Sequence, residues 1–335
     1  MKAVRLNELG GPAKLVLEEI QDPKPAAGEI LVRISRAAFN RRDVFITHGL
    51  YPGIELPRTL GSDGCGVVAA LGEGAKGPAA GTRVVIDPTL GWGDDQRVWR
   101  RDAQVLGMPR DGTFAELIAV PAANVHPAPG HLSDDQAAAI PLAGLTAYRA
   151  CFSRGELSEN DSVLITGIGG GVQTFVLLYA KCAGAKTIVT SRSAEKLARA
   201  KELGADVCVD ATSESWPKQV REAAGGGGPS LVIDSVGGET FAKALDIARY
   251  GARVVVYGGT TGDAKIRPFS IFWKQLDVRG TSMGSPDDFH HMLRIFAKHK
   301  LVPAVDRVFP MREVAAAAER VNANEQFGKV VLAIT

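Results

Sequence analysis

One glycine-rich turn constrains the fold of this chain more than any other feature of its sequence. The segment VLITGIGGGVQTF places Gly167, Gly169, Gly170 and Gly171 directly after a short apolar strand and directly before a helical stretch, 172–184. Glycine lets the backbone turn sharply and approach a pyrophosphate closely, and the N-terminus of the following helix attracts the anion. The turn therefore predicts a dinucleotide site. The alternative is a turn needed only for packing, as in the GGGG at 225–228.

The segments around this turn alternate between strands and helices. Apolar or β-branched runs stand at 163–166, 187–190, 207–210, 230–236 and 252–259, and helical stretches such as the amphipathic 194–205 separate them. This alternation is typical of βαβ units, so we expect an α/β domain with a doubly wound parallel sheet of the Rossmann type.

The residues before about 125 have a different pattern. Ile30, Val32 and Ile34 stand at every second position of EILVRIS, which is the period of a half-buried strand. Short apolar runs at 65–71, 83–87 and 114–120 are separated by glycine turns. We therefore expect a β-rich first domain of antiparallel strands. The terminal KVVLAIT should return to one of the two sheets.

Length and charge exclude several classes of protein. A chain of 335 residues fits two domains. Its 39 basic and 37 acidic residues give a net charge of +2, so no nucleic-acid partner is expected. No apolar run approaches the roughly 18 residues of a membrane span, and the N-terminus lacks a signal-like apolar region. We expect a cytoplasmic protein with no membrane partner. The four cysteines are scattered and form no CxxC pair, which argues against a disulfide framework.

The end of the second strand indicates which dinucleotide is bound. An acidic residue there would bind the ribose 2′-hydroxyl of NAD, but Ser191, Arg192 and Lys196 follow the strand instead. Hydroxyls and cations suit a 2′-phosphate, so we expect NADP(H). The alternative is that both cations are solvated residues of a helix start, although cations there oppose the helix dipole.

Further segments match a known family in order and spacing. They are MKAVRL at the N-terminus, AAFNRRD (37–43), GLYPGIELPRTLGSDGCGVV (49–68), GTFAEL (112–117), PLAGLTAYRA (141–150) and GKVVL (328–332). Together with the glycine turn, they resemble the medium-chain dehydrogenase/reductase superfamily, most closely its zinc-free quinone oxidoreductase-like branch. The resemblance implies a β-rich, GroES-like catalytic domain (1–124 and 284–335), a Rossmann domain (125–283) and a cofactor in the cleft between them. It also implies a homodimer, for which 252–280 would supply a pairing edge.

The chain departs from this family's metal sites. Zinc-dependent members hold the catalytic metal with two cysteines and a histidine, and the matching positions here are Asn40, Ser62 and Leu142. An amide, a hydroxyl and an alkyl group are poor zinc ligands. The family's four-cysteine loop would fall around 90–106, where no cysteine occurs. We therefore predict no metal. The family's GGVG turn also loses its last glycine, which is Gln173 here.

These departures decide the expected chemistry. Alcohol oxidation proceeds through an alkoxide, and without a metal this chain lacks the Lewis acid that would stabilise it. Reduction of quinones and α,β-unsaturated carbonyls needs less help, because these acceptors delocalise the negative charge that hydride addition creates. We predict an NADPH-dependent quinone or enone oxidoreductase acting on a small molecule. Two alternatives stay open: a zinc-free alcohol dehydrogenase or carbonyl reductase, and a non-enzymatic NADPH-binding protein.

Three residues are the candidate catalytic groups. Asn40 can donate its amide N–H to a carbonyl oxygen, or else make a structural hydrogen bond to a nearby loop. Tyr51 can donate a proton or hydrogen bond, or else pack in its turn. For Asp43 we favour a structural role, in which its carboxylate fixes the loop around Asn40.

The candidate cofactor contacts come partly from the turn and partly from the resemblance. Tyr257 and Met283 could equally be core residues, and Lys329 is the candidate from the terminal strand. The full set is Thr146, Gly167, Gly169, Gly170, Gly171, Val172, Ser191, Arg192, Lys196, Ser235, Val236, Tyr257, Gly258, Gly259, Ser282, Met283 and Lys329.

Overall fold

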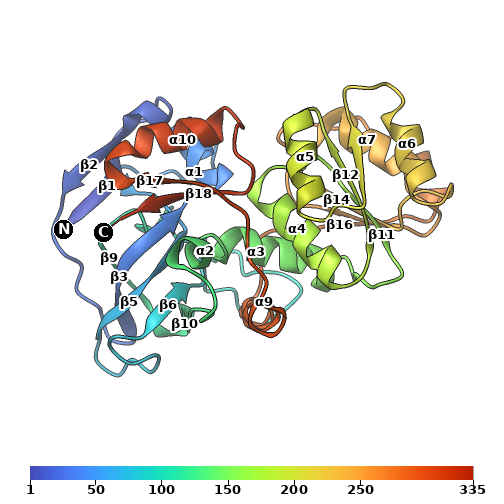
Figure 1. The fold of residues 1–335 in the computed structure, drawn as a ribbon. Coiled ribbons are helices and arrows are strands. Elements are labelled where there is room, and N and C mark those ends of the chain that lie inside the picture. Colours follow the sequence, from blue (N-terminus) through green and yellow to red (C-terminus); the bar gives the residue numbers. More distant parts are fainter. Residues whose placement is uncertain (335) are drawn as a thin grey trace. The chain divides into compact units, whose positions relative to one another are not determined.

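The computed structural model describes residues 1–334, which form two compact units (Figure 1). The first unit combines Met1–Leu145 with the C-terminal segment from Gly284, and the second is Thr146–Met283. Among the described residues, none of the helices has the length and apolar character that crossing a bilayer requires.

The first unit is built around one long strand, β3 (Glu29–Ala38). It pairs antiparallel with β5, β9 and β18 in a seven-stranded sheet of order β10-β6-β5-β3-β18-β17, with β9 beside β3. The strand alternates as predicted, because Ile30, Val32 and Ile34 are buried. The terminal strand β18 joins this sheet by pairing with β3 and β17, as we expected.

The other elements of the first unit are short. Its remaining strands are β1 (Lys2–Leu6), β2 (Leu15–Glu19), β4 (Arg58–Thr59), β5 (Asp63–Leu71), β6 (Arg83–Ile86), β7 (Thr89–Leu90), β8 (Gln104–Val105), β9 (Leu117–Pro121), β10 (Val125–Pro127), β17 (Val305–Pro310) and β18 (Lys329–Ala333). Its helices are α1 (Arg41–Thr47), α2 (Asp134–Ala138), α9 (Pro286–His299), α10 (Val314–Asn322) and the short 3-10 turns Pro12–Lys14, Ala122–Asn124 and Met311–Glu313, while α3 (Pro141–Tyr148) runs across the boundary between the units.

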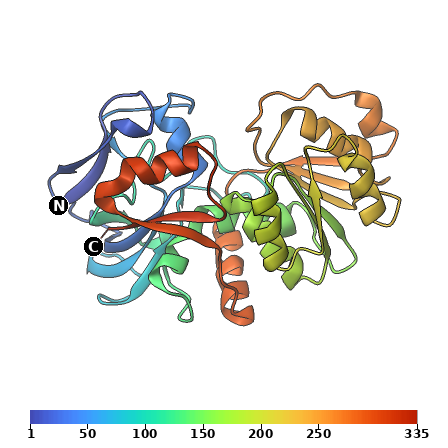
Figure 2. The same ribbon diagram turned by 45° about the horizontal axis from the view of Figure 1, so that its top comes forward.

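The second unit is a six-stranded parallel sheet of order β13-β12-β11-β14-β15-β16. This order runs outward in both directions from the first strand, as in a doubly wound dinucleotide-binding fold, which confirms the predicted fold class. Figures 1 and 2 show α4 and α5 on one face of the sheet and α6 and α7 on the other. The elements are β11 (Ser162–Ile165), α4 (Gly171–Cys182), β12 (Lys186–Ser191), α5 (Ala194–Glu202), β13 (Val207–Asp210), α6 (Trp216–Ala223), β14 (Leu231–Asp234), α7 (Gly238–Ile247), β15 (Arg253–Val256), α8 (Pro268–Phe272), β16 (Asp277–Gly280) and a π-helical turn, Arg149–Ser153.

The first predicted domain boundary needs correction. We expected the Rossmann domain to begin at residue 125, whereas the compact units divide after Leu145. The reason is that β10 pairs antiparallel with β6, and Asp134 on α2 forms an ion pair with Arg83, so these residues pack with the β-rich unit. The second boundary, at 283/284, coincides with the predicted one.

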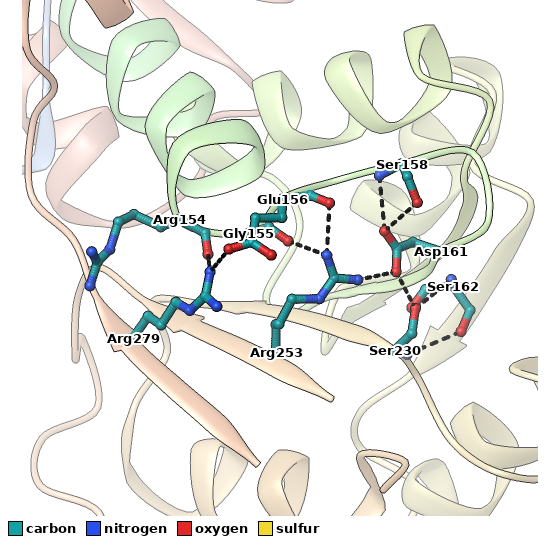
Figure 3. A network of polar contacts seen from close by, with 9 residues as sticks. All are labelled: Arg154, Gly155, Glu156, Ser158, Asp161, Ser162, Ser230, Arg253 and Arg279. Atoms are coloured by element: carbon teal, nitrogen blue, oxygen red, sulfur yellow. Dashed lines mark hydrogen bonds and ion pairs between the residues drawn. The ribbon is translucent and has the colours of Figure 1, made fainter. Parts of the chain in front are cut away.

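A polar network fixes the amino-terminal ends of the parallel strands (Figure 3). The Arg253 guanidinium, at the start of β15, donates to the backbone oxygens of Gly155 and Glu156 and pairs with the buried Asp161. Asp161 also accepts from the Ser230 hydroxyl at 2.6 Å, just before β14. This network ties three strands together at one edge of the sheet and leaves the opposite, carboxyl-terminal edge to loops.

Candidate active site

Three side chains far apart in the sequence form one buried cluster in the first unit. The Lys329 ammonium lies 2.7 Å from Asn40 Oδ1 and 2.7 Å from Asp63 Oδ2. Asn40 Nδ2 donates to the same Asp63 oxygen at 3.0 Å. The side chains of Lys329 and Asp63 are 2% and 0% exposed. Water therefore contributes almost nothing to solvating these charges.

The register of β3 explains why these residues meet. Near the end of β3, Ala38 lies opposite Asp63 on β5 and opposite Val331 on β18. Asn40 follows β3 as the first residue before α1, and Lys329 begins β18. The cluster therefore forms where one end of β3 meets both of its neighbours.

The cluster satisfies nearly all of its hydrogen-bonding capacity. Asp63 Oδ1 accepts the backbone N–H of Leu142 at 2.7 Å, so both carboxylate oxygens have donors. A buried ion pair repays its desolvation only when its remaining polar atoms are bonded in this way. Losing one partner would leave an uncompensated charge inside the unit.

The positions that the family resemblance assigns to zinc ligands do not fit a zinc ion. The oxygen of Asn40 is bound to an ammonium, and Leu142 offers only an alkyl side chain. Ser62 Oγ accepts from Arg42 Nη1 at 2.7 Å and donates to the Leu106 oxygen at 2.8 Å. Zinc in proteins takes thiolate, imidazole or carboxylate ligands, and the nearest carboxylate here is paired with Lys329. Among residues 1–334, no three His, Cys, Asp or Glu side chains are grouped to hold a metal.

Arg42 is a functional candidate that the sequence analysis missed. Its guanidinium is buried, and Nε donates to the Tyr51 hydroxyl at 3.3 Å while Cζ lies 4.8 Å from the Tyr51 ring centroid. It also holds the loop after β8 through the backbone oxygens of Leu106 and Met108. A hydroxyl that accepts a hydrogen bond keeps its own proton to donate. The only signal in the sequence was its place two residues after Asn40, within the family-like segment 37–43.

Asp43 fixes the position of Asn40. Its Oδ2 accepts the Asn40 backbone N–H at 2.8 Å, which closes the N-terminus of α1 in a capping box. Its other oxygen is buried and has no hydrogen-bond partner among the described residues. Burial raises the pKa of Asp43 to about 6, with Arg42 opposing the rise and Asp63 adding to it. This geometry matches the structural reading of Asp43, and a catalytic role for it stays a prediction.

Both ends of the Asn40 amide are in use in this structure. Its oxygen accepts from Lys329 and one N–H donates to Asp63, so only the second N–H of Nδ2 is left to serve a substrate oxygen. Tyr51, by contrast, is half-buried, and within residues 1–334 its oxygen accepts from Arg42 and donates to no other residue. Of the two, Tyr51 therefore has the freer proton.

The glycine-rich turn of the second unit has the backbone that a dinucleotide site needs. Gly167 and Gly169 have φ of 64° and 130°, values that other residues rarely adopt. A Cβ on Gly169 would lie 2.5 Å from Lys196 Cδ, and one on Gly167 would lie 2.6 Å from Val236 Cγ2. Helix α4 begins at Gly171, with Gly170 before it. A bound pyrophosphate would fit this turn and the start of α4.

The residues predicted to read the 2′-phosphate lie together after β12. Ser191 is the last residue of that strand, and its hydroxyl accepts the Ser193 N–H at 3.1 Å. Arg192 is exposed, whereas Lys196 is buried and its stem covers Gly169. No acidic side chain stands between Ser191 and the first turn of α5. The hydroxyl and the two cations thus lie within one short segment, and their contact with a 2′-phosphate stays a prediction.

The other predicted cofactor contacts lie in both units. In the second unit, Ser235 and Val236 follow β14, and Tyr257 to Gly259 follow β15, with Ser282 and Met283 after β16. These positions are the carboxyl-terminal ends of parallel strands, where open α/β sheets bind ligands. Thr146 is a buried residue of α3. Lys329 lies in the first unit, in the ion pair with Asp63, and its contact with a cofactor stays a prediction.

Family models match both parts of the chain. Residues 26–130 match the "Alcohol dehydrogenase GroES-like domain", and residues 171–298 match "Zinc-binding dehydrogenase". The chain is 34% identical to "Zinc-type alcohol dehydrogenase-like protein YogA" of Leptosphaeria maculans, over 96% of this chain and 94% of that protein. It is 30% identical to "Acryloyl-coenzyme A reductase" of Metallosphaera sedula, over 94% and 95%. A crystal structure described as "NAD-dependent alcohol dehydrogenase" superposes with a TM-score of 0.95 at 37% identity, covering 100% of both chains.

The raised pKa of Asp43 predicts a pH-dependent stability difference. The unfolded carboxyl ionises near its ordinary value of 3.8, and the folded one near 6, so the folded state loses stability as the pH rises through this window. Asp43→Asn cannot titrate there. Its thermal midpoint, relative to the unsubstituted protein, should rise between pH 4.5 and 7, by the equivalent of at most about 3 kcal/mol.

A matched control is the exposed carboxylate Glu214 in the second unit. Glu214→Gln should follow the unsubstituted protein at every pH. If the Asp43→Asn curve also runs parallel to it, the buried carboxyl does not titrate as described.

Proposed function

Because the chain belongs to the medium-chain dehydrogenase/reductase superfamily, we propose that it is an NADPH-dependent oxidoreductase that reduces quinones or α,β-unsaturated carbonyls without a metal. One observation carries this proposal. The Lys329 ammonium is bonded to Asn40, the residue at a position where the resemblance would place a zinc ligand. The Lys329 ammonium is thus a cation of the protein itself at the position where zinc-dependent relatives would bind the metal.

The second unit would hold the cofactor. NADPH supplies the hydride when it is bound. Gly167, Gly169, Gly170, Gly171 and Val172 would seat the pyrophosphate, as their backbone conformations allow. Ser191, Arg192 and Lys196 would contact the 2′-phosphate through a hydroxyl and two cations. The residues that follow β14, β15 and β16 would line the rest of the site.

The first unit would supply the proton and the electrostatics. Hydride addition to an enone or quinone places negative charge on the substrate oxygen. Tyr51 has a hydroxyl proton to give, and the Arg42 guanidinium behind it stabilises the charge that remains on the phenol oxygen. Lys329, Asn40 and Asp63 would keep the surrounding backbone rigid through their buried ion pair and hydrogen bonds. Electron-poor acceptors need no further polarisation.

The names of the relatives support two candidate substrates. An acryloyl group is an α,β-unsaturated acyl group, so the relationship to an acryloyl-coenzyme A reductase favours conjugated acceptors. The structure described as an alcohol dehydrogenase favours the second candidate, a metal-free carbonyl reductase or alcohol dehydrogenase with Tyr51 as its acid. The two candidates differ in whether the acceptor must be conjugated.

A substrate panel separates these candidates. Purified protein, treated with a chelator and dialysed, should oxidise NADPH with quinones and enones faster than with saturated aldehydes of the same size. Tyr51→Phe should lower kcat by about 100-fold, the usual size of a general-acid contribution. Turnover of saturated aldehydes alone would favour the second candidate. Activity that disappears with the chelator and returns with zinc would contradict the proposal, and tight NADPH binding with no turnover would indicate a non-enzymatic protein.

Cofactor preference can be tested at Arg192. Replacing it by glutamine removes a bidentate phosphate contact, so NADPH binding should weaken about tenfold while NADH binding stays unchanged. Fluorescence titration with each nucleotide measures both. The exposed Arg249, at the end of α7, is the matched control, and Arg249→Gln should change neither affinity. Equal binding of NADH and NADPH by the unsubstituted protein would overturn the 2′-phosphate assignment.

We also propose that the protein is a homodimer paired through β16. This strand is an edge of the parallel sheet, and edges left open invite pairing with another chain. Beside it, Phe269, Phe272 and Trp273 are 53%, 63% and 58% exposed. Antiparallel pairing centred on Val278 would set Asp277 of one copy against Arg279 of the other.

Light scattering tests this dimer. Trp273→Glu should convert it to a monomer. Leu203→Glu places the same charge on another exposed apolar residue, at the end of α5, and should leave it dimeric. A protein that is monomeric before any substitution would refute the proposal.

A further inference from the structure

Gln173 stands where the family's GGVG turn has its last glycine. Gln173 lies in the first turn of α4, three residues after Gly170. In dinucleotide-binding turns the last glycine allows the helix to pack closely on the sheet. A glutamine is too large to allow the same close packing. Its side chain must therefore either extend into solvent or form specific contacts with the residues around it.

The Gln173 side chain spans the turn. Its Nε2 donates to the Ser235 hydroxyl at 2.5 Å, a residue that follows the neighbouring strand β14. Its Oε1 lies over Gly170, where an added Cβ would be 2.4 Å away. The carboxamide therefore links the start of α4 to the end of β14, at the point where the strand order reverses between β11 and β14.

The segment that Gln173 holds is fixed on its other sides by hydrogen bonds. The backbone oxygen of Ser235 accepts from Thr260, and that of Val236 accepts from Thr261. The N–H of Gly237 donates to Asp234, whose other oxygen accepts from the Thr166 hydroxyl at 2.5 Å. The bond from Gln173 is the side-chain link from α4 to this segment.

We propose that Gln173 is a cofactor-positioning residue that acts through Ser235. By holding the Ser235 hydroxyl, it fixes the 235–237 segment against the glycine-rich turn before the dinucleotide arrives. The entropy cost of ordering this segment is then part of the folding of the protein and not of dinucleotide binding. The affinity for the dinucleotide is higher as a result. The inference rests on the proposed dinucleotide site, but not on the substrate or on the reaction.

The test is a double-substitution cycle with NADPH affinity as the readout. Fluorescence titration of the full chain measures the Kd of Gln173→Ala, Ser235→Ala and the double variant. Each single substitution should raise the Kd about fivefold or more, and adding Gln173→Ala to Ser235→Ala should change it by less than twofold. The NADH Kd should change by the same factor as the NADPH Kd, because neither residue lies beside the 2′-phosphate group around Arg192.

Two further variants test whether the effect comes from the Gln173 hydrogen bond and not from a loss of side-chain volume or of any surface glutamine. Gln173→Met keeps about the size of the side chain, favours helix and lacks the Nε2 donor without adding a charge beside the pyrophosphate, so it should fold and should also weaken binding. Gln219 is the matched control, because its Nε2 donates to the Ser215 hydroxyl at 2.9 Å on α6 in the same way. Gln219→Ala should leave the NADPH Kd unchanged.

The outcomes separate this inference from the proposed function. If the unsubstituted protein binds neither nucleotide, the proposed function fails. If it binds NADPH and Gln173→Ala binds equally well or more tightly, only the role of Gln173 is refuted. Independent effects of the two substitutions, multiplying to about 25-fold or more, would also refute it, since the two residues would then act separately.

Discussion

The buried ion pair between Lys329 and Asp63 is the contact on which the arrangement of the first unit depends. Its members come from β18 and β5, the two strands that flank β3, and Asn40 joins them from the end of β3 itself. Because both charges are almost fully removed from water, each requires the other. The C-terminal strand is therefore held to the N-terminal sheet by hydrogen bonds to β3 and also by this buried ion pair.

This pair also changes the chemistry that the site can perform. A zinc ion would bring a Lewis acid with an open coordination position, whereas the Lys329 ammonium is paired with Asp63 and uses two of its three donors within the cluster. In the proposed function, the acid role belongs to a side chain with a proton to give. We propose Tyr51 for it because Arg42 donates to its oxygen and leaves its proton available for a substrate. The second unit has a separate constraint, the backbone of Gly167 and Gly169, which admits no Cβ without displacing Val236 or Lys196.

Local patterns made much of the fold predictable. The alternation of strands with helical stretches predicted the parallel sheet, and the period of two in β3 predicted a half-buried strand. The unpredicted parts depend on pairing between distant segments. Nothing in the spacing of Asn40 and Lys329 indicates that they meet across 289 positions. The boundary at residue 145 was missed because β10 and α2 are too short to show which unit they join. Arg42 was missed because arginine side chains are usually solvated, and only the structure shows this one, in the first turn of α1, buried against Tyr51.

The central claim is that the Lys329 ammonium, rather than a metal, is the cation at the Asn40 position. Crystals of the protein soaked in zinc, with diffraction data collected on both sides of the zinc absorption edge, test it most directly. The account predicts no anomalous density within bonding distance of Asn40, Ser62 and Leu142, with Lys329 still on Asp63. An anomalous peak at that position, with Lys329 displaced from Asp63, would contradict it.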